Sequence, residues 1–116
     1  MNLERSILSS LINSYHIAPP DNQVKPSDFD FSGVFTNPFH IEIFKTLQAF
    51  EAKGYIIDFA TVEYTLFEAK RSYGGELASR QSEWFAIAAV SAGGKVFVKT
   101  YMALIQHKRK SKIFEV

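Results

Sequence analysis

The sequence predicts an all-α fold, with a small globular helical bundle at residues 1–73 and a protruding helical hairpin at residues 74–116. Two observations support this prediction. Apolar residues recur at spacings of three and four along most of the chain, as they do on one face of a helix. Residues typical of helix caps stand at the ends of these stretches. Strand signals are weak, because the run Tyr55-Ile56-Ile57 is short and lies between caps. We therefore expect one all-α domain.

Residues 24–62 carry the clearest helix signals, and we expect the rest of the chain to fold around them. A helix is predicted over about residues 38–53. Asn37 is a good N-cap, and Pro38 falls at the first helical position, where its missing N–H has no cost. Gly54 is placed to end the helix in the left-handed conformation. These local signals predict both ends of one helix.

A second helix is predicted from residue 59 to about residue 71. Asp58 is its expected N-cap, and Ile57 and Val62 are placed to form a hydrophobic staple. The short linker between the two helices predicts a rigid corner.

The N-terminal segment, residues 2–15, predicts an amphipathic helix capped by Asn2. Residues 19–22 then break the helix, since they include two prolines. Residues 25–36 predict a packed loop. The apolar stripe of the N-terminal helix consists of Leu3, Ile7, Leu8, Leu11, Ile12 and Tyr15.

The last part of the chain predicts two more helices, over about residues 79–91 and 96–113, after a break at Tyr73-Gly74-Gly75. Both helices are apolar on nearly all sides, and such a helix has to be covered on nearly all sides. We expect the hairpin to pair with a second copy of itself. The alternative is that it folds back and completes the core of a monomer. The expected anchors of the pairing are Trp84, Phe85, Phe97, Tyr101, Leu104 and Ile105.

Composition limits the classes of function. The net charge is +1, which argues against a protein whose whole surface binds nucleic acid. There is no cysteine, so a disulfide framework and a thiolate metal site are excluded, and we expect a cytoplasmic protein. A cluster of cations near the C-terminus is expected to be a solvated helix end, with at most weak DNA contact. These cations are Lys108, Arg109, Lys110 and Lys112.

No catalytic, cofactor or metal site is predicted. Gly93-Gly94-Lys95 resembles part of a phosphate-binding loop, but that motif needs a glycine at Ala89 and a hydroxyl residue at Val96. We expect an interhelical turn there. None of the three histidines has a second histidine or a cysteine at ligand spacing. The expectation for His40 is that it caps or packs within the first turn of its helix.

Two further groups in the loop have structural interpretations. Asp28 and Asp30 are an acid–base pair in principle, but at this spacing in a loop they more often accept from backbone N–H groups and hold a turn. An aromatic series is a candidate base-stacking platform, yet such platforms pair aromatic residues with cations, and His40 is the nearest one. Core packing is therefore expected for Phe29, Phe31, Phe35 and Phe39.

Four segments lie in order along the chain: Glu4 to Leu11, Pro26 to Phe29, His40 to Phe44, and Gly54 to Val62. Together they resemble the N-terminal domain of the bacterial DnaB-type replicative DNA helicase. The first is Glu4-Arg5-Ser6-Ile7-Leu8-Ser9-Ser10-Leu11, and the second is the loop Pro26-Ser27-Asp28-Phe29. The third is His40 followed by Ile43 and Phe44, and the fourth is Gly54 to Val62, which fits Gly-x-x-Ile-Asp-x-x-Thr-Val. Phe31-Ser32-Gly33-Val34 resembles an insertion, and the turn at Ala92-Gly93-Gly94 lacks the family's usual Ser/Thr and Asn.

The resemblance implies a non-catalytic oligomerisation domain that docks primase and, in some systems, a helicase loader. It also implies that hairpins pair, so that six copies form a trimer of dimers, while a separate domain carries the ATPase. The chain is then a piece of a longer helicase. Alternatives are the helicase-binding domain of a primase, a free-standing phage or plasmid regulator with this fold, and an independent nucleic-acid-binding domain, which the charge disfavours.

Overall fold

The computed structural model describes residues 2–17, 19–68, 77–90 and 92–114, and it confirms the all-α class. The described residues form helices and connecting segments, with no strand among them. A 3-10 turn, η1, and a π-helical turn, η2, accompany the α-helices. In chain order the elements are α1 (Leu3–Ile17), η1 (Pro20–Asn22), α2 (Pro38–Lys53), α3 (Phe59–Glu63), η2 (Tyr64–Glu68), α4 (Leu77–Ala89) and α5 (Lys95–Phe114).

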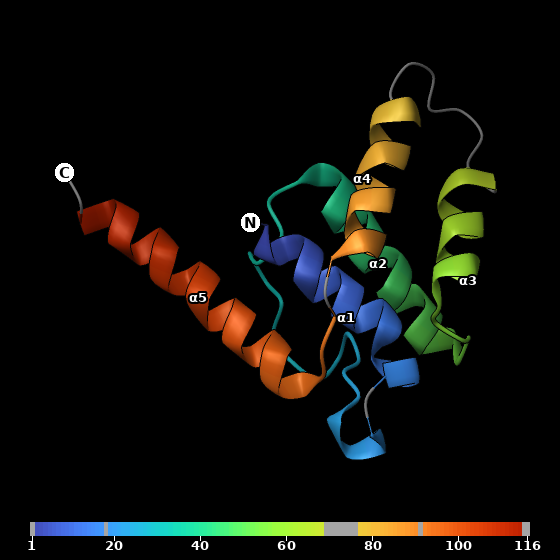
Figure 1. The fold of residues 1–116 in the computed structure, drawn as a ribbon, viewed down its shortest axis with the longest axis horizontal. Coiled ribbons are helices and arrows are strands. Elements are labelled where there is room, and N and C mark those ends of the chain that lie inside the picture. The colour runs from blue at the N-terminus through green and yellow to red at the C-terminus, as the bar shows by residue number, and fades with distance from the viewer. Residues whose placement is uncertain (1, 18, 69–76, 91, 115–116) are drawn as a thin grey trace.

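Helix α1 is the element around which the others are arranged, which corrects the expectation that residues 24–62 form the centre. It contacts α2, α4 and α5 (Figure 1). Its predicted stripe is buried as expected at Ile7, Leu8, Leu11 and Ile12, whereas Leu3 is partly buried and the side chain of Tyr15 lies outside what the structure describes. The serines of this helix are buried too. The residues of α1 with no exposed surface are Ile7, Leu8, Ser9, Ser10, Leu11, Ile12 and Ser14. A helix buried on this scale has to lie inside the molecule.

The three serines with no exposed surface are tolerated because the hydroxyl of each has a backbone partner. Ser10 Oγ accepts a hydrogen bond from the Gly93 N–H at 2.9 Å. Ser14 Oγ accepts from the Val24 N–H at 3.0 Å and lies 3.3 Å from the carbonyl oxygen of the same residue. The small side chains also let these backbone segments come close to α1. The serines therefore join α1 to the connection between α4 and α5 and to the loop before α2.

The ends of α2 follow from its sequence. Asn37 Oδ1 accepts from the Phe39 N–H at 2.9 Å, which makes Asn37 the N-cap. Gly54 has φ of 70°, the left-handed conformation that only glycine adopts readily. The Tyr55 N–H then donates to the Phe50 carbonyl at 2.9 Å, and the two rings lie 5.8 Å apart edge to face. This is the hydrogen bond and the apolar contact of a Schellman ending.

Helix α3 starts with a reciprocal cap. Asp58 Oδ1 accepts from the Thr61 N–H at 2.7 Å, and Thr61 Oγ1 accepts from the Asp58 N–H at 3.2 Å. Ile57 and Val62, the expected staple residues, are both buried in the core. The described part of this helix passes into the π-helical turn η2 and ends at Glu68. Residues 69–71 of the predicted helix lie outside the described residues.

The loop before α2 packs its phenylalanines inward. The rings of Phe31 and Phe35 lie 5.0 Å and 5.1 Å from that of Phe44 on α2. Asp28 Oδ2 accepts from the Lys25 N–H at 2.8 Å, and Asp30 Oδ1 accepts from the Ser32 N–H at 3.0 Å. The aromatic residues are thus core, and the two aspartates hold turns.

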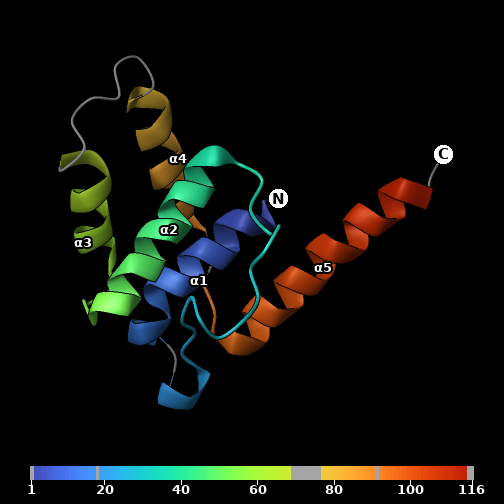
Figure 2. The same ribbon diagram turned by 180° about the vertical axis from the view of Figure 1, so that it is seen from behind.

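Helices α4 and α5 do not lie side by side as a hairpin, which corrects that part of the predicted architecture. They diverge from the turn that joins them, and each contacts α1 (Figures 1 and 2). Trp84 on α4 is buried, with its ring 5.1 Å from that of Phe59 and its Nε1 donating to Glu63 at 2.8 Å. One side of α4 and one side of α5 pack against α1, because α1 has apolar surface on more than one side.

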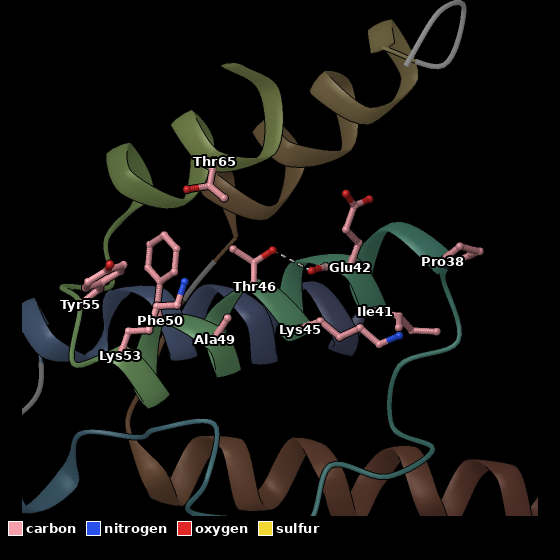
Figure 3. A pocket seen from close by; sticks show the side chains of 10 residues that line it. All are labelled: Pro38, Ile41, Glu42, Lys45, Thr46, Ala49, Phe50, Lys53, Tyr55 and Thr65. Carbon is pink, nitrogen blue, oxygen red and sulfur yellow. Dashed lines mark hydrogen bonds between the residues drawn. The ribbon is translucent and has the colours of Figure 1, made fainter. Parts of the chain in front are cut away.

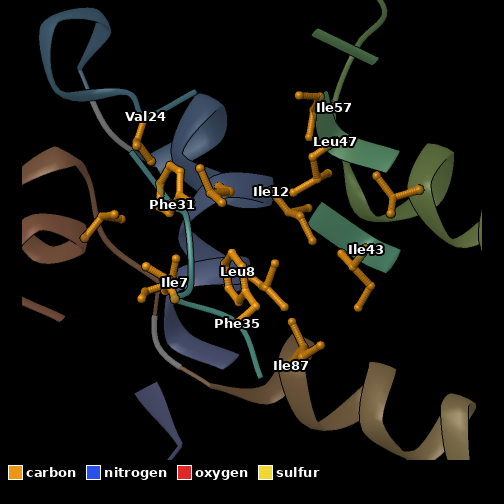
Figure 4. Packing of buried hydrophobic residues seen from close by; sticks show 14 of the residues in the cluster. Ile7, Leu8, Ile12, Val24, Phe31, Phe35, Ile43, Leu47, Ile57 and Ile87 are labelled. Atoms are coloured by element: carbon orange, nitrogen blue, oxygen red, sulfur yellow. The ribbon is translucent and has the colours of Figure 1, made fainter. Parts of the chain in front are cut away.

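One hydrophobic core joins all five helices. Figure 4 shows Leu8 and Ile12 of α1 facing Ile43 and Leu47 of α2, with Ile87 of α4 nearby. The cluster draws on both sides of the expected boundary between residues 73 and 74, which itself lies outside the described residues. Its members from α4 and α5 are Trp84, Ile87, Val98, Met102 and Ile105.

Candidate functional site

The most polar buried site in the described structure is centred on His40, in the first turn of α2. Its side chain has no exposed surface. Nδ1 lies 3.0 Å from Glu4 Oε1, and Nε2 lies 2.7 Å from Glu83 Oε2. An ionised carboxylate can only accept a hydrogen bond, so each contact is formed by a ring N–H of His40 that donates to a carboxylate oxygen. His40 therefore links α1, α2 and α4 through one ring.

Two arginines balance the carboxylates. Arg5 donates from Nε and Nη2 to both oxygens of Glu83 at 2.8 Å and 2.7 Å, a bidentate pair. Arg109 on α5 approaches Glu4 at 4.0 Å and donates to the carbonyl oxygens of Gly33 and Val34. We call Glu4, Arg5, His40, Glu83 and Arg109 the ionic cluster. It ties α5 and the loop before α2 to the other three elements.

The surroundings of both carboxylates favour the ionised form. Burial alone would raise the pKa of Glu4, but hydrogen bonds from His40 and Thr36 outweigh it, and the pKa is lowered. For Glu83 the hydrogen bonds from Arg5 are the largest cause, and with His40 they lower its pKa against the effect of burial. The hydrogen bonds that join the helices here therefore also keep Glu4 and Glu83 ionised.

The geometry of the ionic cluster suits structure better than catalysis. The His40 ring is enclosed, and each nitrogen already faces a carboxylate, so neither is open to a substrate. Within the described residues, no group of histidine, aspartate and glutamate side chains is arranged to hold a metal ion. Sequence reasoning placed His40 in the first helical turn but missed its partners. One signal was available in the sequence: Glu4 and Arg5 stand at the start of an apolar helix. A buried histidine needs polar partners, and charged residues beside an apolar run are candidates for them.

The glycines that resemble a phosphate loop have a packing role. A Cβ on Gly94 would lie 2.4 Å from the Asn22 carbonyl oxygen, and a Cβ on Gly93 would lie 2.5 Å from the Phe97 ring. The Gly93 N–H is already used by Ser10, and the Gly94 carbonyl accepts from the Val98 N–H at 3.1 Å. These residues form the close-packed turn that leads into α5.

The predicted self-association anchors differ in how far they are exposed. Trp84 and Ile105 are buried in the chain's own core, which removes them from the surface available to a partner. Tyr101 is partly buried. Phe85, Phe97 and Leu104 are 64%, 54% and 50% exposed. The exposed members therefore remain candidates, on α4 and on the outer side of α5.

A second apolar surface was not predicted. It lies over α2 and η2, where a groove of about 510 Å³ has Phe50, Tyr55 and Thr65 in its walls (Figure 3). An adjoining groove of about 720 Å³ shares these residues and adds Ile56 and Tyr64. Tyr55-Ile56-Ile57 gave a sequence signal, because Tyr55 belongs to the helix ending and Ile57 to the staple, which leaves Ile56 without a local role.

The C-terminal cations are divided by the structure. Lys108 is exposed, whereas Arg109 is occupied with Glu4 and the loop carbonyls. The side chains of Lys110 and Lys112 lie outside what the structure describes. Arg109 thus has a structural contact that the sequence did not indicate. In the described residues, no helix has the length and apolar character needed to cross a bilayer.

Comparison with protein-family models, with curated proteins and with solved structures found no match to the chain.

Proposed function

We propose that this chain is a non-catalytic self-association and docking domain, of the kind that its resemblance to the N-terminal domain of DnaB-type replicative helicases implies. The partners are then a second copy of the chain and primase, with a helicase loader in some systems. The observation that carries the proposal is an uncovered apolar stripe on α5.

Helix α5 has two apolar stripes at helical spacing. The inner stripe, Val98, Met102 and Ile105, packs against the globular part and is buried. The outer stripe is Phe97, Tyr101 and Leu104, whose spacing of four and three residues puts them on one side of the helix. Phe97 and Tyr101 have ring centroids 6.3 Å apart. The inner stripe is explained by the fold, and the exposed Phe97 and Leu104 of the outer stripe are left for a partner, while Tyr101 is partly buried between them and the core.

The position of α5 suits pairing with another copy. The helix projects from the globule, so none of the other described elements packs on its outer side (Figures 1 and 2). Val96, next to the outer stripe, is 67% exposed and extends the apolar surface. Surfaces of this kind are typical of protein–protein contacts rather than of monomers. A stable pairing would bury more than about 1,000 Å² in total.

The residues of the resemblance also support a fold of the expected kind. Glu4 and His40, from two of the quoted segments, contact each other in the ionic cluster. Asp58 and Thr61, from a third segment, form the reciprocal cap of α3. Segments that are separate in the sequence thus hold elements of one fold.

Sedimentation velocity of the chain from about 10 to about 500 µM tests the proposal. We expect a concentration-dependent dimer that Leu104→Asp or Phe97→Asp dissociates without unfolding the helices. Gln106→Asp is the matched control, since it puts the same charge at an exposed site of α5 on the side away from Phe97. A monomer at every concentration, or equal loss with Gln106→Asp, would refute self-association through this stripe. A separate observation distinguishes a helicase from a free-standing regulator: only a helicase would carry a phosphate-loop motif downstream in the same reading frame.

A further inference from the structure

The apolar surface over α2 and η2 is large and exposed. Tyr55, Ile56 and Tyr64 are 58%, 72% and 65% exposed, although they are among the largest apolar side chains of the region. The caps of α2 and α3 explain the path of the backbone here, but they do not require these three side chains to be exposed to solvent. We call the two adjoining grooves together the α2–η2 groove. Its lining includes Phe50, Tyr55, Ile56 and Tyr64, together with Lys45 and Lys53 of α2.

The charge at this groove that is not balanced by an ion pair is positive. Its ionisable lining residues are Glu42, Lys45 and Lys53, apart from the two tyrosines. Glu42 is in an ion pair with Arg80 of α4, so its charge is balanced within the fold. Lys53 lies 5.7 Å from the centre of the Tyr55 ring, and neither lysine has an ion-pair partner among the described residues. The groove therefore combines an apolar floor with two cations along α2 (Figure 3).

We propose that the α2–η2 groove binds an amphipathic α-helix of a partner protein, with carboxylates along one flank of its apolar face. The walls are themselves helices, and no strand edge is present in the described residues for an extended peptide to pair with. Apolar side chains of the partner at i, i+3 or i+4, and i+7 would lie between Tyr55, Ile56 and Tyr64. Its aspartates or glutamates would face Lys45 and Lys53.

This site is separate from the one that carries the proposed function. None of the α5 stripe residues lines the α2–η2 groove, and none of the groove residues lies on α5. Loss of self-association through α5 and loss of peptide binding at the groove are therefore distinguishable by variants on the two surfaces.

The experiment is selection of a displayed library of helix-forming peptides, about 16 residues long, against the immobilised full chain. We expect enriched peptides with apolar residues at helical spacing and acidic residues on one flank. Ile56→Ser and Tyr64→Ser should each weaken an enriched peptide at least about tenfold, as loss of a central contact does. Leu77→Ser, at an exposed apolar site on α4 that belongs to neither surface, is the matched control and should leave binding unchanged.

A charge reversal makes the test specific. The chain with Lys45→Glu and Lys53→Glu should enrich basic peptides in place of acidic ones, whereas Lys99→Glu on α5 should not change the preference. No enrichment, enrichment of proline-rich extended peptides, or binding that survives Ile56→Ser would overturn the proposal. So would loss of self-association with Ile56→Ser, because the groove would then be an interface between copies of this chain.

Discussion

His40 shows how one buried residue can connect several elements. Its ring is fully enclosed, and it is acceptable there only because Glu4 and Glu83 supply a carboxylate for each nitrogen. Those partners lie 36 and 43 residues away in the sequence. No local pattern in the sequence specifies such distances. The sequence therefore predicts that His40 packs in the first turn of α2 but not what it packs against.

Replacing His40 should be costly. His40→Ala would leave Glu4 and Glu83 without the imidazole that bridges them, and removing one partner of a buried polar network costs about 3 kcal/mol. His40→Gln should cost less, because its amide can still donate to one carboxylate. Urea unfolding measures both changes. The control is His107→Ala on the exposed side of α5, and equal losses at His40 and His107 would contradict the account.

The cap of α3 gives a second prediction at the scale of the residue. Asp58→Asn should be mild, since asparagine also accepts from the Thr61 N–H, whereas Asp58→Ala should cost about 1 kcal/mol. Thermal unfolding compares the two variants. Large and equal losses would show that the charge of Asp58 matters beyond its capping oxygen. Caps such as Asn37, Gly54 and Asp58 were predictable because each depends on residues within four positions.

The two apolar stripes of α5 show where sequence reasoning about elements ran out. Val98 and Phe97 are neighbours with the same apolar character, and helical spacing identifies both stripes equally well. Only the position of α1 decides that the stripe of Val98 is covered by the chain itself. The predicted hairpin assumed that one stripe of α5 packs against α4. The sequence does not reveal that α1, with its buried serines, packs against several other elements.

The turn before α5 allows a test of close packing. Gly94→Ala should cost about 2–3 kcal/mol, because the new Cβ would meet the Asn22 backbone at 2.4 Å and the turn would have to move. Gly54→Ala is the comparison, since open space surrounds that position and only its left-handed backbone is unfavourable, by about 1 kcal/mol. Urea midpoints rank the two. A smaller loss at Gly94 than at Gly54 would show that the turn is not tightly packed.

At the scale of the whole molecule, the class of fold was predictable and the arrangement of helices was not. Helical periodicity and caps are local, so they predict most helix ends within a few residues. The order of packing depends on contacts across the chain, such as Ser10 with Gly93 and Arg5 with Glu83. The α2–η2 groove belongs to the same category. Tyr55, Ile56 and Tyr64 are visible in the sequence as apolar residues, but their exposure depends on how α3 leaves α2.

The ionic cluster also predicts how the molecule responds to acid. Glu4 and Glu83 have pKa values below the ordinary value of 4.5 in the folded chain, so the unfolded chain binds their protons more readily. Their contribution to stability is therefore complete above about pH 4.5 and is lost as the pH falls through the lower, folded values. The charges that face them are His40 from α2, Arg5 from α1 and Arg109 from α5. Urea unfolding from pH 7 to pH 3 measures the effect.

In the wild-type chain, the free energy of unfolding should fall with pH below about 4.5, with a slope that reflects proton uptake on unfolding by both carboxylates. Glu83→Gln should reduce the slope by up to about one proton and lower the stability at pH 7, since Arg5 and His40 lose an ionised partner. Glu68→Gln, at an exposed site of η2, is the matched control. An unchanged slope in Glu83→Gln would mean that the carboxylates of the ionic cluster are not what couples this fold to acid.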